Sequence, residues 1–239
     1  MIESKDNEKL KLVRKLRERK HREREGLFAT EGEDLLAAGL AAGAGPRFVL
    51  VAAGSGTGGD EVAPDLLDAV STLGSGTRAI AVWPLPRPAA PTAPCVYLDG
   101  VGDPGNVGTI VRTAHALLDA TVALGPGCAD AYGPKATRAS MGSLFARPPV
   151  TVAGVGATPE PRVALVAHGG QGPAALAGAA TLCLGAEREG LPDDVLAACG
   201  TTVTIPLKGS AESLNVAAAA AIACERISSP VMSVERPGA

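Results

Sequence analysis

The sequence predicts an α/β protein in which a small α/β module precedes a larger domain built on a parallel sheet. Short apolar runs alternate with helix-like segments along most of the 239 residues, an order typical of α/β domains. The runs of the second half are continuously apolar, as in parallel strands covered on both faces. Residues 84–94 hold five prolines, which remove backbone donors and favour an extended linker between two folded parts.

We therefore expect a module over residues 1–83, a linker over 84–94, a domain over 95–229 and a tail over 230–239. In the module, the charged residues 3–25 favour a helix. Thr30-x-x-Glu33 has the spacing of a capping box, which predicts that a second helix begins at Thr30. The hydrophobic pattern then predicts a strand, a helix and a strand at residues 47–53, 63–73 and 78–83.

The larger domain is expected to alternate strands with helices. Apolar runs predict strands at residues 95–100, 121–125, 149–154, 162–168, 180–185 and 202–207. Helices fit residues 106–118, 134–142, 192–199 and 213–227. The last of these is rich in alanine, the residue with the highest helix propensity.

The composition excludes several classes of protein. Hydrophobic residues make up 46% of the chain and aromatic residues 3%, so Ala, Val and Leu are expected to fill the core. No apolar run reaches the roughly 18 residues that a membrane span needs, and the charged N-terminus does not resemble a signal peptide. The five scattered cysteines form no CxxC pair, which favours reduced thiols in a cytoplasmic protein and no metal site.

The net charge of −3 conceals a basic N-terminus. Residues 1–25 hold ten Lys or Arg and six Asp or Glu, whereas the rest of the chain is acidic. One interpretation is a solvated helix with ion pairs four residues apart. The other is an arm that contacts the phosphates of a nucleic acid. Because the body of the chain is acidic, such contact would have to be local.

The stretch from Tyr97 to Ala116 contains Gly100-x-Gly102-x-x-Gly105, which fits the fingerprint of a dinucleotide site. Two observations argue against that interpretation. The next strand ends without an acidic residue for the ribose, and Pro104 supplies no amide for a pyrophosphate. What remains is a loop and a helix that bears Asn106, a good N-cap residue, and Arg112.

Two further loops follow predicted strands with a similar polar and glycine-rich character. In LCLGAEREGLPDDVL, residues 182–196, Glu187 lies in a loop bounded by glycines before a helix that starts near Pro192. In residues 204–227, a Gly/Ser loop leads into a helix that starts near Ser213 or Asn215. Loops at the carboxyl ends of parallel strands are where open α/β sheets bind ligands.

Three motifs in this order resemble a known family. They are DPGNVGTIVRTAHA at residues 103–116, LGAEREGLP at 184–192 and IPLKGSAESLNVAAAAAI at 205–222. Their order and spacing resemble the SpoU (TrmH-like) RNA ribose 2′-O-methyltransferases of the SPOUT superfamily. The resemblance covers roughly residues 95–227. The first module, with its basic helix and LFATEGEDLL, is similar to the substrate-binding domain of members that act on ribosomal RNA.

The resemblance implies a fold, a cofactor and an assembly. The C-terminal domain would be a trefoil-knotted parallel-sheet domain, a rare exception to the usual topology rules. S-adenosyl-L-methionine would be the cofactor, no metal would be needed, and a homodimer would complete each active site. Backbone groups and glycines of the second and third motifs would bind the cofactor, namely Leu184, Gly185, Gly190, Ile205, Leu207, Gly209 and Leu214.

The resemblance also implies catalytic roles. Arg112 matches the family's catalytic arginine, and Asn106 and Glu187 would orient it or shape the cofactor loop. Ser213 and Asn215 would help to orient the substrate. Structural roles stay open, because Glu187 suits a tight loop and the other two suit helix capping. Arg112 acts either as a base or, since guanidinium hardly ever loses its proton, as a stabiliser of the developing alkoxide.

Basic residues outside these motifs are candidates for contact with RNA phosphates. They are Arg14, Lys15, Arg17, Arg19, Lys20, Arg22, Arg24, Lys135, Arg138 and Arg147. The expected activity is transfer of a methyl group to a ribose 2′-hydroxyl of structured RNA, with large-subunit ribosomal RNA as the leading substrate. Two alternatives stay open at this point: a transfer RNA substrate, and a non-catalytic RNA-binding protein of the same fold.

Overall fold

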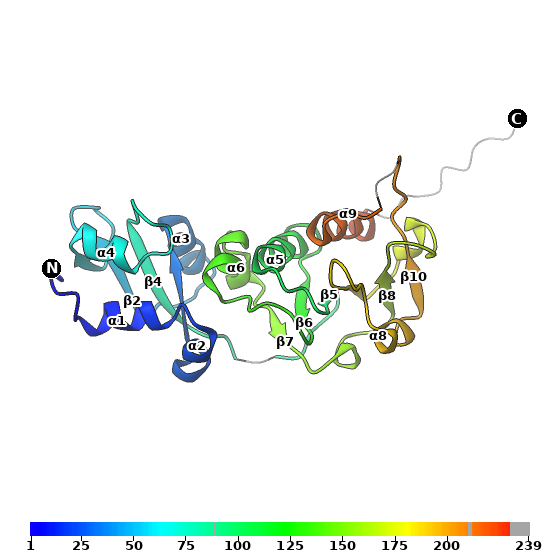
Figure 1. Ribbon diagram of the computed structural model, residues 1–239, viewed down its shortest axis with the longest axis horizontal. Coiled ribbons are helices and arrows are strands. Elements are labelled where there is room, and N and C mark those ends of the chain that lie inside the picture. Colours follow the sequence, from blue (N-terminus) through cyan, green and yellow to red (C-terminus); the bar gives the residue numbers. More distant parts are fainter. Residues whose placement is uncertain (88, 210–211, 230–239) are drawn as a thin grey trace, which may run out of the picture. The chain divides into compact units, whose positions relative to one another are not determined.

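The computed structural model describes residues 1–87, 89–209 and 212–229, and the predicted tail at 230–239 lies outside these ranges (Figure 1). The chain forms two compact units. The first contains Met1–Ala89, Asp103–Arg112 and Ala129–Pro148, and the second contains the other segments. Each unit is built around its own sheet.

The first unit has a four-stranded sheet in the order β1-β4-β2-β3. The central strand β4 (Ala79–Pro84) pairs antiparallel with β1 (Leu27–Glu31) and with β2 (Phe48–Ala52). The short β3 (Asp60–Val62) pairs parallel with β2. Strands β2 and β4 lie where the hydrophobic pattern predicts them, whereas β1 and β3 were not predicted.

The predicted capping box at Thr30 is wrong. Thr30 lies in β1, where its buried hydroxyl accepts a hydrogen bond of 2.8 Å from the Trp83 Nε1–H. Helix α3 (Glu33–Ala41) instead has Gly32 at its N-cap. Pairing with β4 and burial of the indole therefore outweigh the local capping signal, because both satisfy buried polar groups.

The predicted single helix over residues 3–25 is also wrong, since the segment forms α1 (Glu8–Lys15) and α2 (Arg19–Glu25). The helical conformation is interrupted between α1 and α2, and Leu16, the first residue after α1, is buried. With α4 (Pro64–Val70), helix α1 covers a face of the sheet. The buried residues there are Leu10, Val13, Leu16, Leu27, Leu50, Val62, Leu67, Val70, Ile80 and Val82.

Residues that follow the proline-rich segment complete the first unit. Helix α6 (Pro134–Ala139) contacts β1, and α7 (Ser143–Ala146) contacts α3. Most of the chain's few aromatic rings gather here: the Phe145 ring centroid lies 4.7 Å from that of Trp83 and 5.9 Å from that of Phe28. Aromatic pairs at such separations stabilise a core beyond the area that they bury.

The second unit has a six-stranded parallel sheet in the order β10-β8-β9-β5-β6-β7. The strands are β5 (Cys95–Leu98), β6 (Thr121–Leu124), β7 (Val150–Thr151), β8 (Arg162–Leu165), β9 (Thr181–Leu184) and β10 (Thr201–Val203). All the pairings are parallel, which confirms the predicted sheet. Every residue of β5 and β9 is buried, in agreement with their continuous apolar pattern.

Helices connect these strands near the predicted positions. They are α5 (Pro104–Leu118), α8 (Asp193–Ala197) and α9 (Val216–Ser228), together with the short 3₁₀ turns η1 (Val155–Ala157) and η2 (Pro173–Leu176). Helix α9 packs on β9 and η2. All five cysteines are free thiols. Within the described ranges, every helix is too short or too polar to cross a lipid bilayer.

A buried ion pair ties α2 to the segment that follows the proline-rich region. The guanidinium of Arg22, whose side chain is 5% exposed, donates to the Asp130 carboxylate and to the carbonyl oxygens of Leu16 and Arg17. The Nε–Oδ2 distance is 2.9 Å. Because every branch of the guanidinium is engaged inside the fold, Arg22 is a structural residue, which corrects the expectation that it contacts RNA.

We predict that Arg22→Ala lowers the free energy of unfolding by about 3 kcal/mol, because it leaves the Asp130 carboxylate without its buried partner. Arg19→Ala is the matched control, since it removes an exposed pair with Glu23 and should change the free energy by less than about 1 kcal/mol. Urea unfolding followed by tryptophan fluorescence measures both. Equal losses in the two variants would contradict the structural role of Arg22.

Candidate functional site

A cavity of about 360 Å³ opens where β8, β9 and β10 end. Three loops and the start of α9 form its walls. The lining residues are Leu165, Val166, Ala167, Leu184, Gly185, Ala186, Glu187, Arg188, Glu189, Gly190, Leu191, Leu196, Ile205, Leu207, Glu212, Ser213, Leu214, Val216 and Ala219. Its volume and its mostly apolar wall suit a small organic ligand.

The loop after β9 is closed by a tight backbone pairing. The Ala186 N–H donates to the Gly190 carbonyl at 3.1 Å, and the Gly190 N–H donates back to the Ala186 carbonyl at 3.0 Å. A Cβ atom on Gly185 would lie 2.2 Å from the carbonyl carbon of Gly190, which itself has φ +72°. Side chains are therefore excluded at Gly185, and backbone groups form this part of the cavity wall.

Asn215 connects this loop to α9. Its Oδ1 accepts hydrogen bonds from the Ala217 and Ala218 N–H groups, so Asn215 caps the helix. Its Nδ2 donates to the Glu187 Oε1 at 3.1 Å. The capping interpretation of Asn215 is therefore confirmed, and its amide nitrogen also holds a carboxylate at the cavity.

The sequence-predicted residues of the second and third motifs converge on this cavity. Those that line it are Leu184, Gly185, Glu187, Gly190, Ile205, Leu207, Ser213 and Leu214. Gly209, with φ +74°, is not among the described lining residues. Ser213, Leu214 and Asn215 are exposed at the mouth of the cavity or beside it.

Sequence reasoning missed the third side of the cavity, which the loop after β8 supplies. Leu165, Val166 and Ala167 lie there because β8 stands between β9 and β10 in the sheet. The alternation of strands and helices does not reveal strand order, so no local signal marked these residues. The missed residues Leu196 and Ala219 lie on elements predicted as helices, and their burial depends on the same arrangement.

The first motif covers most of α5, and its residues 103–112 belong to the first unit. Asp103 caps this helix: its Oδ1 accepts from the Asn106 N–H at 2.9 Å. The expectation that Asn106 is the N-cap is therefore wrong, since Asn106 lies inside the first turn. The Lys135 ammonium donates to the Asp103 Oδ2 at 2.6 Å. This bond and the amide bond from Asn106 lower the pKa of the Asp103 carboxyl.

Arg112 lies on the exposed face of α5. Its neighbours Ile110, Val111 and Ala114 are buried in the fold, whereas Thr109 and Arg112 are exposed. Within the described ranges the Arg112 guanidinium forms no ion pair or hydrogen bond. Arg112 and Asn106 belong to the first unit, and Glu187, Ser213 and Asn215 belong to the second. In the same ranges, no group of three or more His, Cys, Asp or Glu side chains forms a metal site.

Both parts of the chain match known protein families. The SpoU rRNA Methylase family matches residues 93–225, and the MRM3-like substrate binding domain matches residues 7–74. The chain belongs to the SpoU rRNA methylase family.

Several known methyltransferases are similar to this chain over nearly its whole length. A Bacillus subtilis protein named 23S rRNA (guanosine(2553)-2′-O)-methyltransferase RlmP is 35% identical, and the match covers 92% of this chain and 96% of the relative. The crystal structure of the SpoU methyltransferase AviRb from Streptomyces viridochromogenes in complex with AdoMet has a TM-score of 0.79 at 28% identity, over 91% of this chain and 96% of that one. A putative TrmH-family RNA methyltransferase from Porphyromonas gingivalis has a TM-score of 0.76 at 32% identity, over 94% and 97%.

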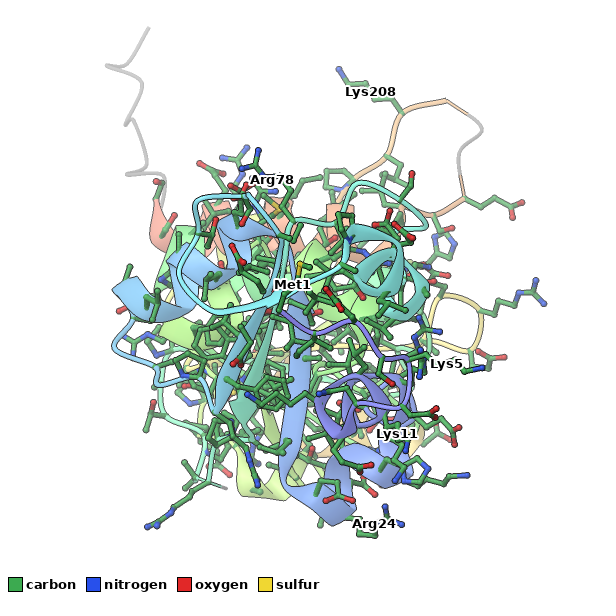
Figure 2. All side chains as sticks on the ribbon, turned by 90° about the vertical axis from the view of Figure 1, so that its left-hand side faces the viewer. Met1, Lys5, Lys11, Arg24, Arg78 and Lys208 are labelled. Carbon is green, nitrogen blue, oxygen red and sulfur yellow. The ribbon has the colours of Figure 1, made fainter. Side chains whose placement is uncertain are left out.

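Most of the basic residues that the sequence suggested as phosphate contacts have partners within this SpoU protein. Arg19 pairs with Glu23, Lys20 with Glu18, and Arg24 with Glu25. The remaining bonds run from Arg14 to the Lys5 carbonyl, from Arg17 to the Ser71 carbonyl, from Arg138 to Thr72 and from Lys135 to Asp103. Lys15 is exposed, Arg147 is half-buried, and Arg24 reaches the periphery in Figure 2. Exposed pairs are weak and leave these cations accessible to a phosphate.

We predict that Asp103→Ala destabilises the SpoU protein by about 1 kcal/mol at neutral pH, because the helix that carries Arg112 loses its cap. Asp103→Asn is the control, since it keeps the accepting oxygen and removes only the charge. The lowered pKa of Asp103 means that the carboxylate stabilises the fold above its unfolded pKa of about 3.9. This contribution is lost as the pH falls through the lower folded pKa.

Thermal unfolding across pH 2 to 7 measures these effects. We expect the difference between wild type and Asp103→Asn to shrink as the pH falls below about 4. A constant difference over that range, or an Asp103→Ala variant as stable as Asp103→Asn, would contradict the capping role.

Proposed function

We propose that this protein transfers a methyl group from S-adenosyl-L-methionine to a ribose 2′-hydroxyl of large-subunit ribosomal RNA. The observation that carries the proposal is the cavity at the ends of β8, β9 and β10, which two of the family's three motifs line. The Bacillus subtilis relative named as a 23S rRNA 2′-O-methyltransferase supports the activity and the substrate. The MRM3-like substrate binding domain at residues 7–74 favours ribosomal over transfer RNA.

The residues of the cavity fit S-adenosyl-L-methionine. Gly185 admits no side chain, so the ligand meets the backbone of the loop closed by Gly190. Leu184, Ile205 and Leu207 supply apolar contact. Solved relatives with AdoMet bound, AviRb and a Sinorhizobium meliloti rRNA methyltransferase, support this assignment. When bound, the cofactor supplies a methyl group that carries the electrophilic character of a sulfonium.

Arg112 is proposed as the residue that meets the reacting hydroxyl. Negative charge develops on the 2′-oxygen as it loses its proton, before an oxygen–carbon bond replaces the carbon–sulfur bond, and a fixed cation stabilises that charge. The guanidinium keeps its own proton near neutral pH, so solvent or a nearby phosphate receives the proton from the hydroxyl. The exposure of Arg112 and its lack of an ion-pair partner in the described ranges support this role. Asn106 is proposed to orient the arginine and the ribose.

The carboxylate of Glu187 is proposed to shape the cofactor cavity within the second unit. Its hydrogen bond from Asn215 fixes one carboxylate oxygen beside the cavity. Ser213, on the same segment as Asn215, offers a hydroxyl at the cavity wall that would orient the substrate. Gly209, just outside the lining residues, is proposed to let its loop approach the cofactor closely, since φ +74° suits a glycine turn.

We further infer a homodimer with a knotted C-terminal domain over residues 95–229, acting in the cytoplasm. Exposed apolar side chains on two helices support association: Leu117 on α5 is 39% exposed and Ile222 on α9 is 38% exposed. Such residues lose contact with water when a second subunit covers them. The knot is inferred from membership of the SpoU family.

Arg112→Ala is expected to lower the rate of methyl transfer by at least about 10²-fold, because the developing alkoxide loses its fixed cation. Affinity for S-adenosyl-L-methionine should stay close to that of wild type. The measurement is tritium transfer from labelled cofactor to ribosomal and transfer RNA fractions of cells that lack this protein, with cofactor binding measured by calorimetry.

The destination of the label tests the substrate. Tritium in the 2′-O-methyl groups of large-subunit ribosomal RNA is the expected result. Label confined to transfer RNA would show that transfer RNA, not ribosomal RNA, is the substrate. If the wild-type protein binds the cofactor but labels no RNA, the proposed activity is overturned. Full activity of Arg112→Ala would remove this residue from the chemistry.

A further inference from the structure

A second cavity, of about 340 Å³, lies within the first unit and is distant in sequence from the methyl-transfer motifs of the second. Four segments form it: β1 at Phe28, the turn after α3, the end of β4, and α7 with the residues after it. The lining residues are Phe28, Ala42, Gly43, Ala44, Gly45, Trp83, Pro84, Leu85, Pro86, Leu144, Phe145 and Pro148. Nothing in the proposed methyl transfer uses this cavity.

The turn after α3, the end of β4 and the α7 segment each carry an arginine and no acidic residue. Strand β1 carries Glu31, whose carboxylate accepts hydrogen bonds from Ser71 and Thr72. Arg47 follows the turn in AAGAGPRF (residues 41–48), Arg87 ends WPLPR (83–87), and Arg147 lies in LFARP (144–148). Arg47 and Arg87 are exposed, and Arg147 is half-buried. None of the three arginines lines the cavity, but each lies within two residues of a residue that does. In a chain with a net charge of −3, this placement of cations favours an anionic ligand.

The acidic residue closest along the backbone does not reverse this balance. The Leu85 N–H donates to the Gly26 carbonyl at 2.8 Å, which places Glu25 near the end of β4. The Glu25 carboxylate is already paired with the Arg24 guanidinium at 2.7 Å. Arg24 and Glu25 add no net charge, so the exposed Arg47 and Arg87 keep the balance near the cavity positive.

The cavity wall offers flat apolar surface and few polar groups. Phe28 and Trp83 are buried, while Phe145 is half-buried and Pro84 and Pro86 are exposed. The one side-chain donor among the lining residues, the Trp83 Nε1–H, is already bonded to the Thr30 hydroxyl. A ligand would thus be held by apolar contact with the half-buried Phe145 ring and the exposed prolines, which accepts any base, and not by hydrogen bonds that read a base edge.

We propose that this cavity holds one unstacked nucleobase of the RNA substrate, with the neighbouring phosphates on Arg47 and Arg87. The inference rests on the proposed function in one respect: it takes RNA as the ligand. A nucleotide joins a flat ring to a phosphate, and these two groups match an apolar cavity with arginines nearby. The first unit, which also carries Arg112, would then hold the RNA through this base as well.

Trp83 provides a direct probe, because it is the only tryptophan of the chain and lines the cavity. The full-length protein is titrated with a short single-stranded RNA of mixed sequence while Trp83 emission is recorded. The anisotropy of a labelled copy of the RNA reports binding independently. We expect the emission to change and saturate at the same RNA concentrations as the anisotropy.

Variants of these arginines test the charge near the cavity. Arg47→Ala/Arg87→Ala should weaken binding by about tenfold or more, and should flatten the dependence of log affinity on log salt by about 1.4, the value for two lost single-strand phosphate contacts. Arg78→Ala is the control, because Arg78 precedes β4 whereas the cavity and Arg87 lie at the other end of this strand. Arg24, two residues before the Gly26 that bonds to Leu85 at the cavity end, marks that end in Figure 2, and Arg78 lies opposite to it in the view. The control should bind like wild type. Thermal unfolding and the RNA-free emission spectrum confirm that each variant is folded.

The outcomes separate this inference from the proposed function. RNA binding that leaves Trp83 emission unchanged, or double-variant binding equal to that of Arg78→Ala, overturns the cavity while methyl transfer to ribosomal RNA still supports the enzyme. Saturable quenching by RNA in a protein that transfers no methyl group supports the cavity and overturns the activity. Quenching by polyglutamate and not by RNA would assign the cavity to an acidic peptide and refute the proposal.

Discussion

The close approach of Gly185 to Gly190 is the constraint on which the candidate site depends. Two backbone hydrogen bonds between Ala186 and Gly190 close the loop after β9, and a Cβ atom at Gly185 would overlap the facing peptide at 2.2 Å. This geometry excludes a side chain at Gly185, and the exposed Glu187 two residues later lines the cavity. The parallel sheet makes such a site possible, because β8, β9 and β10 end at one edge.

Asn215 couples that loop to the rest of the second unit. One side chain caps α9 and holds Glu187, so the helix and the β9 loop are fixed together. In the first unit, Arg22 and Thr30 play comparable parts: the buried guanidinium joins α2 to Asp130, and the threonine hydroxyl satisfies the indole of Trp83. In each case hydrogen bonds make a polar side chain a fixed part of the fold. Arg22 and Thr30 are buried with these bonds, whereas Asn215 stays exposed.

The sequence was most informative where residue type and local geometry agree. Continuous apolar runs predicted the parallel strands β5 and β9, and the glycine-rich motifs predicted most of the cavity wall. It failed where long-range pairing decides the conformation. Thr30 carried a capping signal but lies in a strand, since pairing with β4 requires it. Asn106 has the chemistry of an N-cap, yet Asp103 takes that position. Strand order, and with it the contribution of Leu165, depends on packing that no local pattern encodes.

Binding of S-adenosyl-L-methionine to Gly185→Ala tests the central claim most directly. Gly172→Ala is the matched control, since a Cβ there meets nothing within 4 Å. In isothermal calorimetry we expect wild type and Gly172→Ala to bind alike and Gly185→Ala to lose at least about tenfold in affinity, since a tenfold loss corresponds to only about 1.4 kcal/mol. Equal thermal unfolding midpoints would show that the loss is local. Wild-type affinity in a folded Gly185→Ala variant would contradict the claim that this turn holds the cofactor.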